Sequence, residues 1–185
     1  MEKLLLVGSG GFGRVVLEYA QANYNCAFLD DEEAKTVDGV PVIGKTNDIE
    51  SFYPEYNLLL VTIGNNDLRE KLYHRAKIAG YAFPNIIHPS AYVSQHAHIG
   101  SGCVILNNAV VQNNDRCGDG CILNPGVELH HDSSIGNYCL IYTNSVVRSL
   151  SNVGHRVWIG SNATVATSAI VPDDARIEDG YVIQA

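Results

Sequence analysis

The sequence lacks the features that mark nucleic-acid-binding, secreted and membrane-spanning proteins. Its 12 lysine and arginine residues are outnumbered by 20 aspartate and glutamate residues, so the net charge is −8. No basic stripe is present to neutralise phosphates or an acidic membrane. The apolar run in MEKLLLVGSG is too short for a signal peptide, and no later segment approaches a membrane span. We therefore expect a cytoplasmic protein with no nucleic-acid or membrane partner, whose five cysteines are free thiols.

The first motif in the chain is a glycine turn between an apolar strand and an amphipathic helix, within residues 3–20. The helix is expected to bury Val15, Val16, Tyr19 and Ala20. The glycines follow the spacing Gly8-x-Gly10-x-x-Gly13. That spacing lets a backbone approach a diphosphate and presents the phosphates to the N-terminus of a helix. A tight strand-to-helix turn without a ligand is the alternative interpretation.

Two further apolar runs end in polar residues. NCAFLDD ends in Asp30 and Asp31, whose carboxylates can accept hydrogen bonds from ribose or base, and NLLLVTIG is followed by Asn65 and Asn66. We expect Asn66 to cap a second helix. The buried face expected for that helix is Leu68, Leu72, Ala76 and Ala79. In a parallel β-α-β sheet these strand ends converge on one edge, which favours a ligand there.

Residues 1–84 supply only half of a dinucleotide-binding fold, because that fold needs two mononucleotide-binding halves. The sequence therefore predicts a Rossmann-like half domain over 1–84. It favours a mononucleotide or a nucleotide-linked small molecule over NAD as the ligand.

From residue 85 to 185 the sequence repeats every six residues without a break. The first position of each row is mostly small, and the sixth is rich in Gly, Asn and Asp, which tolerate left-handed backbone. A strict period of six over this length predicts a parallel β-helix with three short strands per coil and about five coils. The third position is apolar in every row and is expected to point inward: Ile87, Val93, Ile99, Ile105, Val111, Cys117, Leu123, Leu129, Ile135, Ile141, Val147, Val153, Ile159, Val165, Val171, Ile177 and Ile183.

Cys103, Cys121 and Cys139 are one coil apart and are expected to form an inward column of small apolar side chains. A stacked thiolate metal site is the alternative for this column.

The row VELHHD places His130, His131 and Asp132 at a corner after the inward Leu129. These residues can be solvated turn residues. In the alternative interpretation, one of the two histidines is a general base, because a neighbouring carboxylate can fix the tautomer of its imidazole. The β-helix of trimeric carbonic anhydrases suggests a third reading, a metal site with an H-x-x-x-x-H pair and a third histidine about two coils earlier. Gly136 and Gln95 occupy the corresponding positions here, so we expect no metal.

Several motifs together resemble one family, the sugar acetyltransferases that join a small nucleotide-binding domain to a left-handed β-helix. They are GSGGFGR, FLDD, GVPVIG, IGNNDLR, IHPSA, LNPG and HDSSIG, and they occur in the family's order over essentially the whole chain. The family includes N-acetyltransferases of nucleotide-linked 4-amino sugars and sialic acid O-acetyltransferases. The resemblance implies an acetyl-CoA-dependent enzyme, without a metal, that forms a homotrimer and acts in surface polysaccharide or glycan synthesis.

The resemblance also implies roles for individual residues. His131 would be the catalytic base, Asp132 would orient it, and Asn124 would lie near the substrate. Backbone N–H groups around Ser149 would bind the thioester oxygen. The nucleotide-binding residues would be Gly10, Phe12, Gly13, Asp30, Asp31, Asn65 and Asn66. The CoA-binding residues would be Ser149, Gly160, Ser161, Ala166 and Thr167.

Three positions depart from the family pattern. Phe12 stands where a histidine is usual, Leu140 replaces a second active-site histidine, and Arg148 begins a segment that is usually small. The resemblance as a whole makes acetyl transfer to a nucleotide-linked amino sugar the leading hypothesis. The alternatives are O-acetylation of a sialic-acid-type sugar, a non-catalytic nucleotide-sugar-binding scaffold, and a metal-dependent hydratase.

Overall fold

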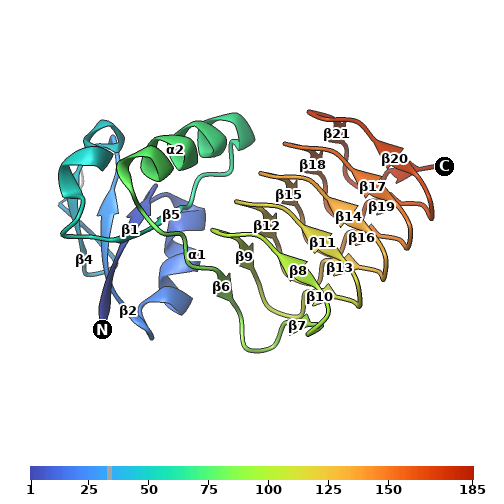
Figure 1. Cartoon of the computed structure of the whole chain (residues 1–185), viewed down its shortest axis with the longest axis horizontal. Helices are drawn as coiled ribbons and strands as arrows, with labels where there is room; N and C mark the ends of the chain where they lie inside the picture. Colours follow the sequence, from blue (N-terminus) through green and yellow to red (C-terminus); the bar gives the residue numbers. More distant parts are fainter. Residues whose placement is uncertain (33–34) are drawn as a thin grey trace. The chain divides into compact units, whose positions relative to one another are not determined.

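The computed structural model describes residues 1–32 and 35–185 and divides the chain into two compact units, Met1–Ile86 and Ile87–Ala185. Figure 1 shows the helices and long strands of the first unit and the stacked short strands of the second. The fold class expected from the sequence, an α/β part followed by a left-handed parallel β-helix, is confirmed.

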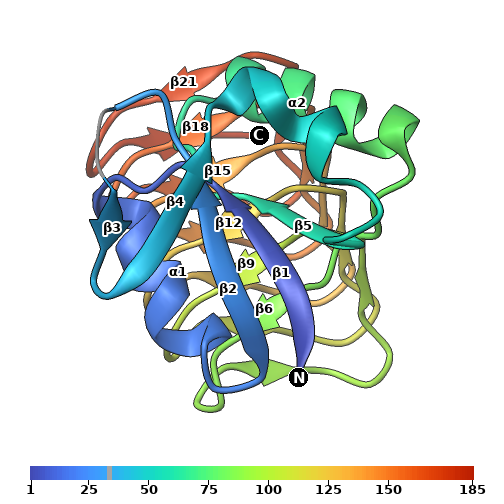
Figure 2. The ribbon, with the colours of Figure 1, turned by 90° about the vertical axis from the view of Figure 1, so that its left-hand side faces the viewer.

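The first unit is a five-stranded sheet in the order β3-β4-β2-β1-β5. Figure 2 looks onto β4, β2 and β1. β1, β2, β4 and β5 run parallel, and β3 is antiparallel to β4. The elements are β1 (Glu2–Val7), α1 (Gly11–Ala20), β2 (Tyr24–Leu29), β3 (Thr36–Val37), β4 (Val40–Gly44), the 3₁₀ helix η1 (Thr46–Phe52), β5 (Leu58–Val61) and α2 (Asn66–Ala79).

Both helices of this unit bury faces that differ in part from those expected. α1 buries Gly13, Val16, Leu17 and Ala20. α2 buries Arg69, Leu72, Tyr73 and Ala76. The expected core residue Leu68 is 43% exposed, and the cap of α2 is Asn65, not Asn66. The prediction was wrong there because the buried face is centred between Arg69, Leu72, Tyr73 and Ala76, and Leu68 lies at its edge.

The second unit consists of two-residue strands spaced six residues apart. The three sheets contain the strands β22-β19-β16-β13-β10-β7, β20-β17-β14-β11-β8 and β21-β18-β15-β12-β9-β6. The strands are β6 (Ile86–Ile87), β7 (Tyr92–Val93), β8 (His98–Ile99), β9 (Val104–Ile105), β10 (Val110–Val111), β11 (Arg116–Cys117), β12 (Ile122–Leu123), β13 (Glu128–Leu129), β14 (Ser134–Ile135), β15 (Leu140–Ile141), β16 (Val146–Val147), β17 (Asn152–Val153), β18 (Trp158–Ile159), β19 (Thr164–Val165), β20 (Ile170–Val171), β21 (Arg176–Ile177) and β22 (Val182–Ile183).

The interior of the β-helix follows the repeat. The third-position residues from Ile105 to Ile177 are buried and form one apolar cluster, against which Val93, Ile99 and Ile183 pack. Ile87 is the exception, at 42% exposed. Every sixth position from Gly102 to Gly180 has a positive φ, including three with large side chains: Tyr138, Leu150 and Arg156.

The cysteine side chains of the column point inward, as expected: Cys103, Cys121 and Cys139 are fully buried, and none of the three forms a disulfide bond. Each thiol lies 3.1 Å from a glycine carbonyl fifteen residues later, as Cys121 does from Gly136.

Candidate functional site

A cavity of about 360 Å³ lies at the strand ends of the first unit. Four of the predicted nucleotide-binding residues line it: Gly10, Phe12, Asp30 and Asp31. α1 begins at this cavity, with Gly10 as its N-cap, no side-chain cap and no acidic residue in its first turn. The N–H groups of that turn need partners, and the N-terminus of a helix favours a negative charge. The wall formed by the glycine turn therefore suits a phosphate.

Asp30 ties this glycine turn to β2. Its Oδ2 accepts hydrogen bonds from the Ser9 amide at 2.5 Å and the Ser9 hydroxyl at 2.8 Å, and its Oδ1 accepts from the Glu32 amide at 2.9 Å. Partial burial alone would raise the pKa of the Asp30 carboxyl, but these hydrogen bonds outweigh burial and lower it. Asp30 is therefore an ionised, structurally engaged carboxylate on the cavity wall.

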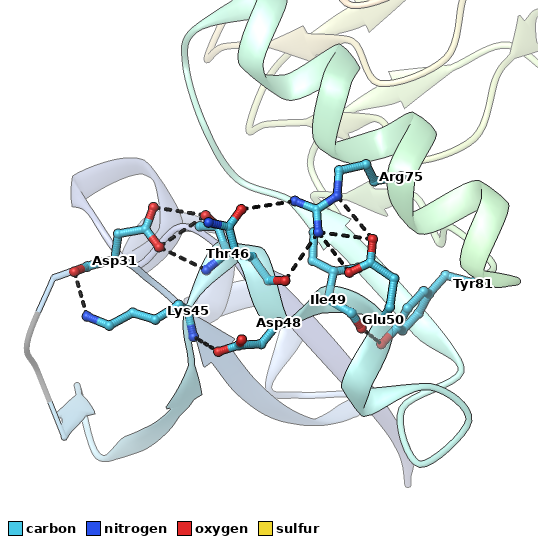
Figure 3. A network of polar contacts seen from close by, with 9 residues as sticks. Asp31, Lys45, Thr46, Asp48, Ile49, Glu50, Arg75 and Tyr81 are labelled. Atoms are coloured by element: carbon cyan, nitrogen blue, oxygen red, sulfur yellow. Dashed lines mark hydrogen bonds and ion pairs between the residues drawn. The ribbon is translucent and has the colours of Figure 1, made fainter.

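Asp31 holds Thr46, a cavity residue that the sequence did not reveal (Figure 3). The Thr46 amide donates to Asp31 Oδ1 at 3.0 Å, and the Thr46 hydroxyl lies 2.8 Å from Oδ2. The Lys45 ammonium donates to the Asp31 carbonyl at 2.7 Å. Thr46 stands two residues after the end of β4, whose apolar run is the sequence signal that could have placed a fourth strand end at this edge.

The structure does not bring the other three predicted nucleotide residues to the cavity lining. Gly13 lies against the Gly8 carbonyl, where an added Cβ would be 2.1 Å from that oxygen, so its glycine is required for strand–helix packing. The Asn65 side chain caps α2 by accepting from the Leu68 amide, and Asn66 accepts from Arg69. The remaining lining residues are Gly8, Gly11, Thr46, Thr62, Ile63, Gly64 and Leu68.

The second site lies at a corner of the β-helix, in a hollow of about 510 Å³ lined by Tyr92, Gln112, Asn113, His131 and Asp132. His131 Nδ1 is 2.8 Å from Asp132 Oδ2. An ionised carboxylate can only accept, so Nδ1 carries the hydrogen and Nε2 is left as the basic nitrogen.

Asp132 combines the turn role and the orienting role. Its φ of 62° is the left-handed conformation of a corner residue. Its Oδ1 accepts from the Asn114 side-chain amide at 2.7 Å. This bond, followed by the bond to His131, lowers the pKa of the Asp132 carboxyl. The two interpretations of the corner are therefore compatible for this residue.

The coil before the corner supports the backbone of His131. Gln112 Oε1 accepts from the His131 amide at 3.0 Å. The backbone amide of Gln112 in turn donates to Asp115 Oδ2 at 2.7 Å. Asp115 Oδ1 accepts from the backbone amide and the hydroxyl of Ser133. Asp115 is fully buried, and burial raises its carboxyl pKa despite these bonds.

His130 has a different carboxylate partner, since its Nε2 is 3.1 Å from Glu128 Oε2. The side chain of His130 is 30% exposed, whereas that of His131 is 58% exposed. The hollow is lined by His131 and not by His130, so the geometry separates the two neighbouring histidines.

The remaining predicted acyl-transfer residues fall on two corners. Ser149 and Thr167 stand one and two coils beyond His131, and Ala166 precedes Thr167, because β13, β16 and β19 pair in register. Asn124, Gly160 and Ser161 follow β12 and β18, which belong to another sheet. Asn124 donates its side-chain amide to the Ile141 carbonyl at 3.0 Å and is not brought to His131.

One coil beyond His131 and Asp132, the amides of Ser149 and Leu150 have no hydrogen-bond acceptor within the described part of the chain. The amides 18 residues before and after that of Leu150, in Asp132 and Ser168, donate to a carbonyl of the preceding coil at 3.1 Å. The row of hydrogen bonds between coils is therefore interrupted at Leu150, and the amides of Ser149 and Leu150 remain available as donors one coil beyond His131.

Within residues 1–32 and 35–185, no group of three or more His, Cys, Asp or Glu side chains is placed to hold a metal ion. No helix of that part is both long and apolar enough to cross a membrane.

A left-handed β-helix that follows an α/β unit in the chain, with an oriented histidine at a corner, is typical of the class of hexapeptide-repeat acyltransferases. Residues 3–76 match the family described as PglD N-terminal domain. UDP-N-acetylbacillosamine N-acetyltransferase of Bacillus subtilis (strain 168) is 33% identical over 117 residues, which are 57% of this chain and 52% of that protein. The match thus spans about half the length of that curated relative.

Solved structures extend the similarity over the whole chain. The acetyltransferase domain of PglB from Neisseria gonorrhoeae FA1090 is 34% identical, with a TM-score of 0.95 over 100% of this chain and 92% of that chain. PerB from Caulobacter crescentus, in complex with CoA and GDP-perosamine, is 29% identical, with a TM-score of 0.94 over 100% and 89%. The chain belongs to the same acetyltransferase family as this PglB domain, and the resemblance drawn from the sequence motifs is confirmed.

Proposed function

We propose that the protein transfers an acetyl group from acetyl-CoA to the amine of a nucleotide-linked amino sugar, with His131 as the general base. The observation that carries this proposal is the 2.8 Å contact between His131 Nδ1 and Asp132 Oδ2 beside an open hollow. The family relatives support the substrate class, since one was solved with CoA and GDP-perosamine.

The reaction follows from the orientation of the imidazole. The sugar amine attacks the thioester carbonyl carbon, and its proton passes to His131 Nε2 as the C–N bond forms. Asp132 stabilises the imidazolium. The carbonyl oxygen gains negative charge and is held by backbone N–H groups at Ser149 and Leu150. The C–S bond then breaks, and the CoA thiolate takes the proton from His131.

The nucleotide part of the acceptor would occupy the cavity of the first unit. Its phosphates would face the N-terminus of α1, and its sugar or base hydroxyl groups would face Asp30 and Asp31. All four oxygen atoms of these two carboxylates already accept protein donors, so they offer oriented lone pairs and little freedom to rotate. Pocket residues Phe12 and Leu68 add apolar surface for a base.

A homotrimer is part of the proposal. The predicted CoA and substrate contacts divide between the corner of His131 and the corner of Asn124 and Gly160, which do not meet within one prism. Copies that face one another around a symmetry axis would bring one corner of each type into a shared cleft. We infer that the protein acts in the cytoplasm and that its product serves surface polysaccharide or glycan synthesis.

Thiol release from acetyl-CoA tests the proposal, with UDP- and GDP-linked 4-amino sugars as acceptors. His131→Ala should lower kcat about 10²- to 10⁴-fold, the range for loss of a general base. His130→Ala is the matched control, because it removes the neighbouring imidazole and its Glu128 contact, and it should retain most activity.

Three results would contradict the assignment. Unchanged turnover in His131→Ala would remove its catalytic role. Nucleotide-sugar binding without thiol release in the wild type would favour a scaffold, whereas turnover only with sialic-acid-type hydroxyl acceptors would favour O-acetylation.

A further inference from the structure

Arg75, in the middle of α2, binds the segment η1 through all three of its guanidinium nitrogens (Figure 3). Its Nε and Nη2 donate to the Glu50 carboxylate at 3.1 and 2.8 Å. Its Nη1 donates to Asn47 Oδ1 at 3.3 Å, and Nη2 also lies 3.2 Å from the Asn47 carbonyl. One side chain therefore fixes two residues of η1, including the backbone immediately after Thr46.

A second contact from beyond the end of α2 reinforces this arrangement. The Tyr81 hydroxyl donates to the Ile49 carbonyl at 2.8 Å. Burial, followed by the nearby charge of Glu50, raises the pKa of Tyr81 to about 12, so the hydroxyl keeps its hydrogen. The first turn of η1 is closed by the Lys45 amide, which donates to Asp48 Oδ2 at 2.8 Å.

The N-terminal end of η1 reaches the cavity. Thr46 lines the cavity, and its amide and hydroxyl both donate to Asp31. The same cavity is also lined by Leu68, in the first turn of α2, and by Gly64, which precedes that helix. The helix that supplies one wall therefore also sets, through Arg75, where the Thr46–Asp31 wall stands.

We propose that Arg75 is a positioning residue for the nucleotide-linked substrate, holding η1 so that Thr46 and Asp31 keep their places in the cavity. This inference rests on the proposed function, because it takes the cavity to be the nucleotide site. Arg75 does not line the cavity and acts through Asn47 and Glu50.

The expected effect is local and not global. The side chains of Arg75 and Glu50 are 36% and 51% exposed, and ion pairs with this much solvent contact contribute little to the stability of a whole domain. Loss of the guanidinium should instead release η1 from α2 and loosen one wall of the cavity.

Calorimetric binding of UDP and GDP to the full chain tests the inference without any need for turnover. Arg75→Ala should raise the Kd of the preferred nucleotide about fivefold, the loss expected for roughly one hydrogen bond. Arg75→Lys should fall between the two, because a lysine has one nitrogen for acceptors that the guanidinium reaches with three. In turnover assays the KM for the acceptor should rise, while kcat and the KM for acetyl-CoA stay the same.

Lys3→Ala is the matched control. It breaks another exposed ion pair of the same unit, Lys3–Glu55 at 2.7 Å, whose members do not line the cavity. It should bind nucleotide as the wild type does, and the thermal midpoints of both variants should stay close to that of the wild type.

Three results would overturn the inference. Wild-type affinity in Arg75→Ala would refute the positioning role and leave the proposed function standing. Equal weakening in Lys3→Ala, or weakening that follows a lower thermal midpoint without partial rescue by lysine, would show a general structural effect. A wild-type chain that binds neither nucleotide would refute the nucleotide site and this inference together, even if thiol release is observed.

Discussion

The strands of the two units bury their side chains in different ways. In β1 of the first unit, Leu4, Leu5, Leu6 and Val7 are all fully buried, whereas in β19 of the β-helix Val165 is fully buried and Thr164 only partly. A parallel sheet covered on both faces reads as a continuous apolar run, and a coil of the β-helix has one inward position per short strand. Because three six-residue rows make one coil, a side chain's environment repeats every 18 residues in the β-helix, whereas the first unit has no such period.

That difference governs how polar residues are used. In the β-helix a corner residue such as Asp132 inherits its left-handed backbone from its place in the row. The first unit uses residues near its strand ends in three different ways. Asp30 binds the glycine turn, Asn65 caps α2, and Gly13 permits close packing of α1 against the turn. A repeat therefore assigns conformation by position, whereas a mixed sheet assigns it by individual contacts.

The largest effect should come from placing a charge in one strand of each unit. Val165→Asp should destabilise the β-helix by more than about 4 kcal/mol, because it buries an unpaired carboxylate. Thr164→Asp, one residue earlier, should cost less than about 1 kcal/mol. In β5, both Leu59→Asp and Leu60→Asp should be severe, since both residues are fully buried. Urea unfolding and soluble yield would measure this, and equal costs at positions 164 and 165 would contradict the one-sided burial.

A smaller effect is expected for the polar contacts that occur once. Asp30→Asn should cost about 1–3 kcal/mol near neutral pH, because one amide cannot accept from both Ser9 donors and the Glu32 amide as a carboxylate does. The hydrogen bonds place the folded pKa of Asp30 below its usual 3.8. Its stabilisation is therefore full above 3.8 and is lost as the pH falls through the lower folded value.

Unfolding free energies of the wild type and Asp30→Asn at about pH 7 and about pH 3 would test the sign. The gap between the two proteins should narrow at the lower pH. A gap that widens on acidification would mean that the pKa is raised in the folded state.

At the corners of the β-helix, the repeat predicts a stabilising change. Leu150 has a φ of 65°, in the left-handed region, and it is 60% exposed. Burial of its side chain therefore does little to offset the strain of its backbone. Leu150→Gly should stabilise the protein by about 1 kcal/mol, the strain of a non-glycine residue in that region. Gly180→Ala, at a φ of 68° with no atom within 4 Å of the added Cβ, is the reverse change and should destabilise. Thermal midpoints would compare them, and destabilisation in Leu150→Gly would show that the leucine makes a compensating contact.

The smallest effect should come from exchanging equivalent positions within the repeat. Cys121 donates to the Gly136 carbonyl at 3.1 Å, and Ser145 donates to the Gly160 carbonyl at the same offset of fifteen residues. Cys121→Ser should therefore cost less than about 1 kcal/mol, because the hydroxyl finds the same acceptor. Cys121→Val, which removes the donor and adds bulk at a filled position, should cost more. If the two substitutions are equally costly in urea unfolding, the thiol contact has no energetic role.

The sequence by itself determined the period of six, the inward third positions, the left-handed corners and the order of an α/β part before the β-helix. These features depend on local backbone preferences and on apolar spacing, which a single chain displays directly. It also determined four residues that line the cavity, Gly10, Phe12, Asp30 and Asp31, because glycine spacing and strand ends are local signals.

Only the tertiary structure decided which polar group binds which. Asn65 and not Asn66 caps α2, and Thr46 joins the cavity from the start of η1, which the sequence did not reveal. Glu128 pairs with His130, whereas Asp132 pairs with His131. The physical reason is that each donor or acceptor is satisfied by whatever partner the fold brings within about 3 Å, and that partner is often distant in the chain. Arg75 and Glu50, 25 residues apart, are the clearest case.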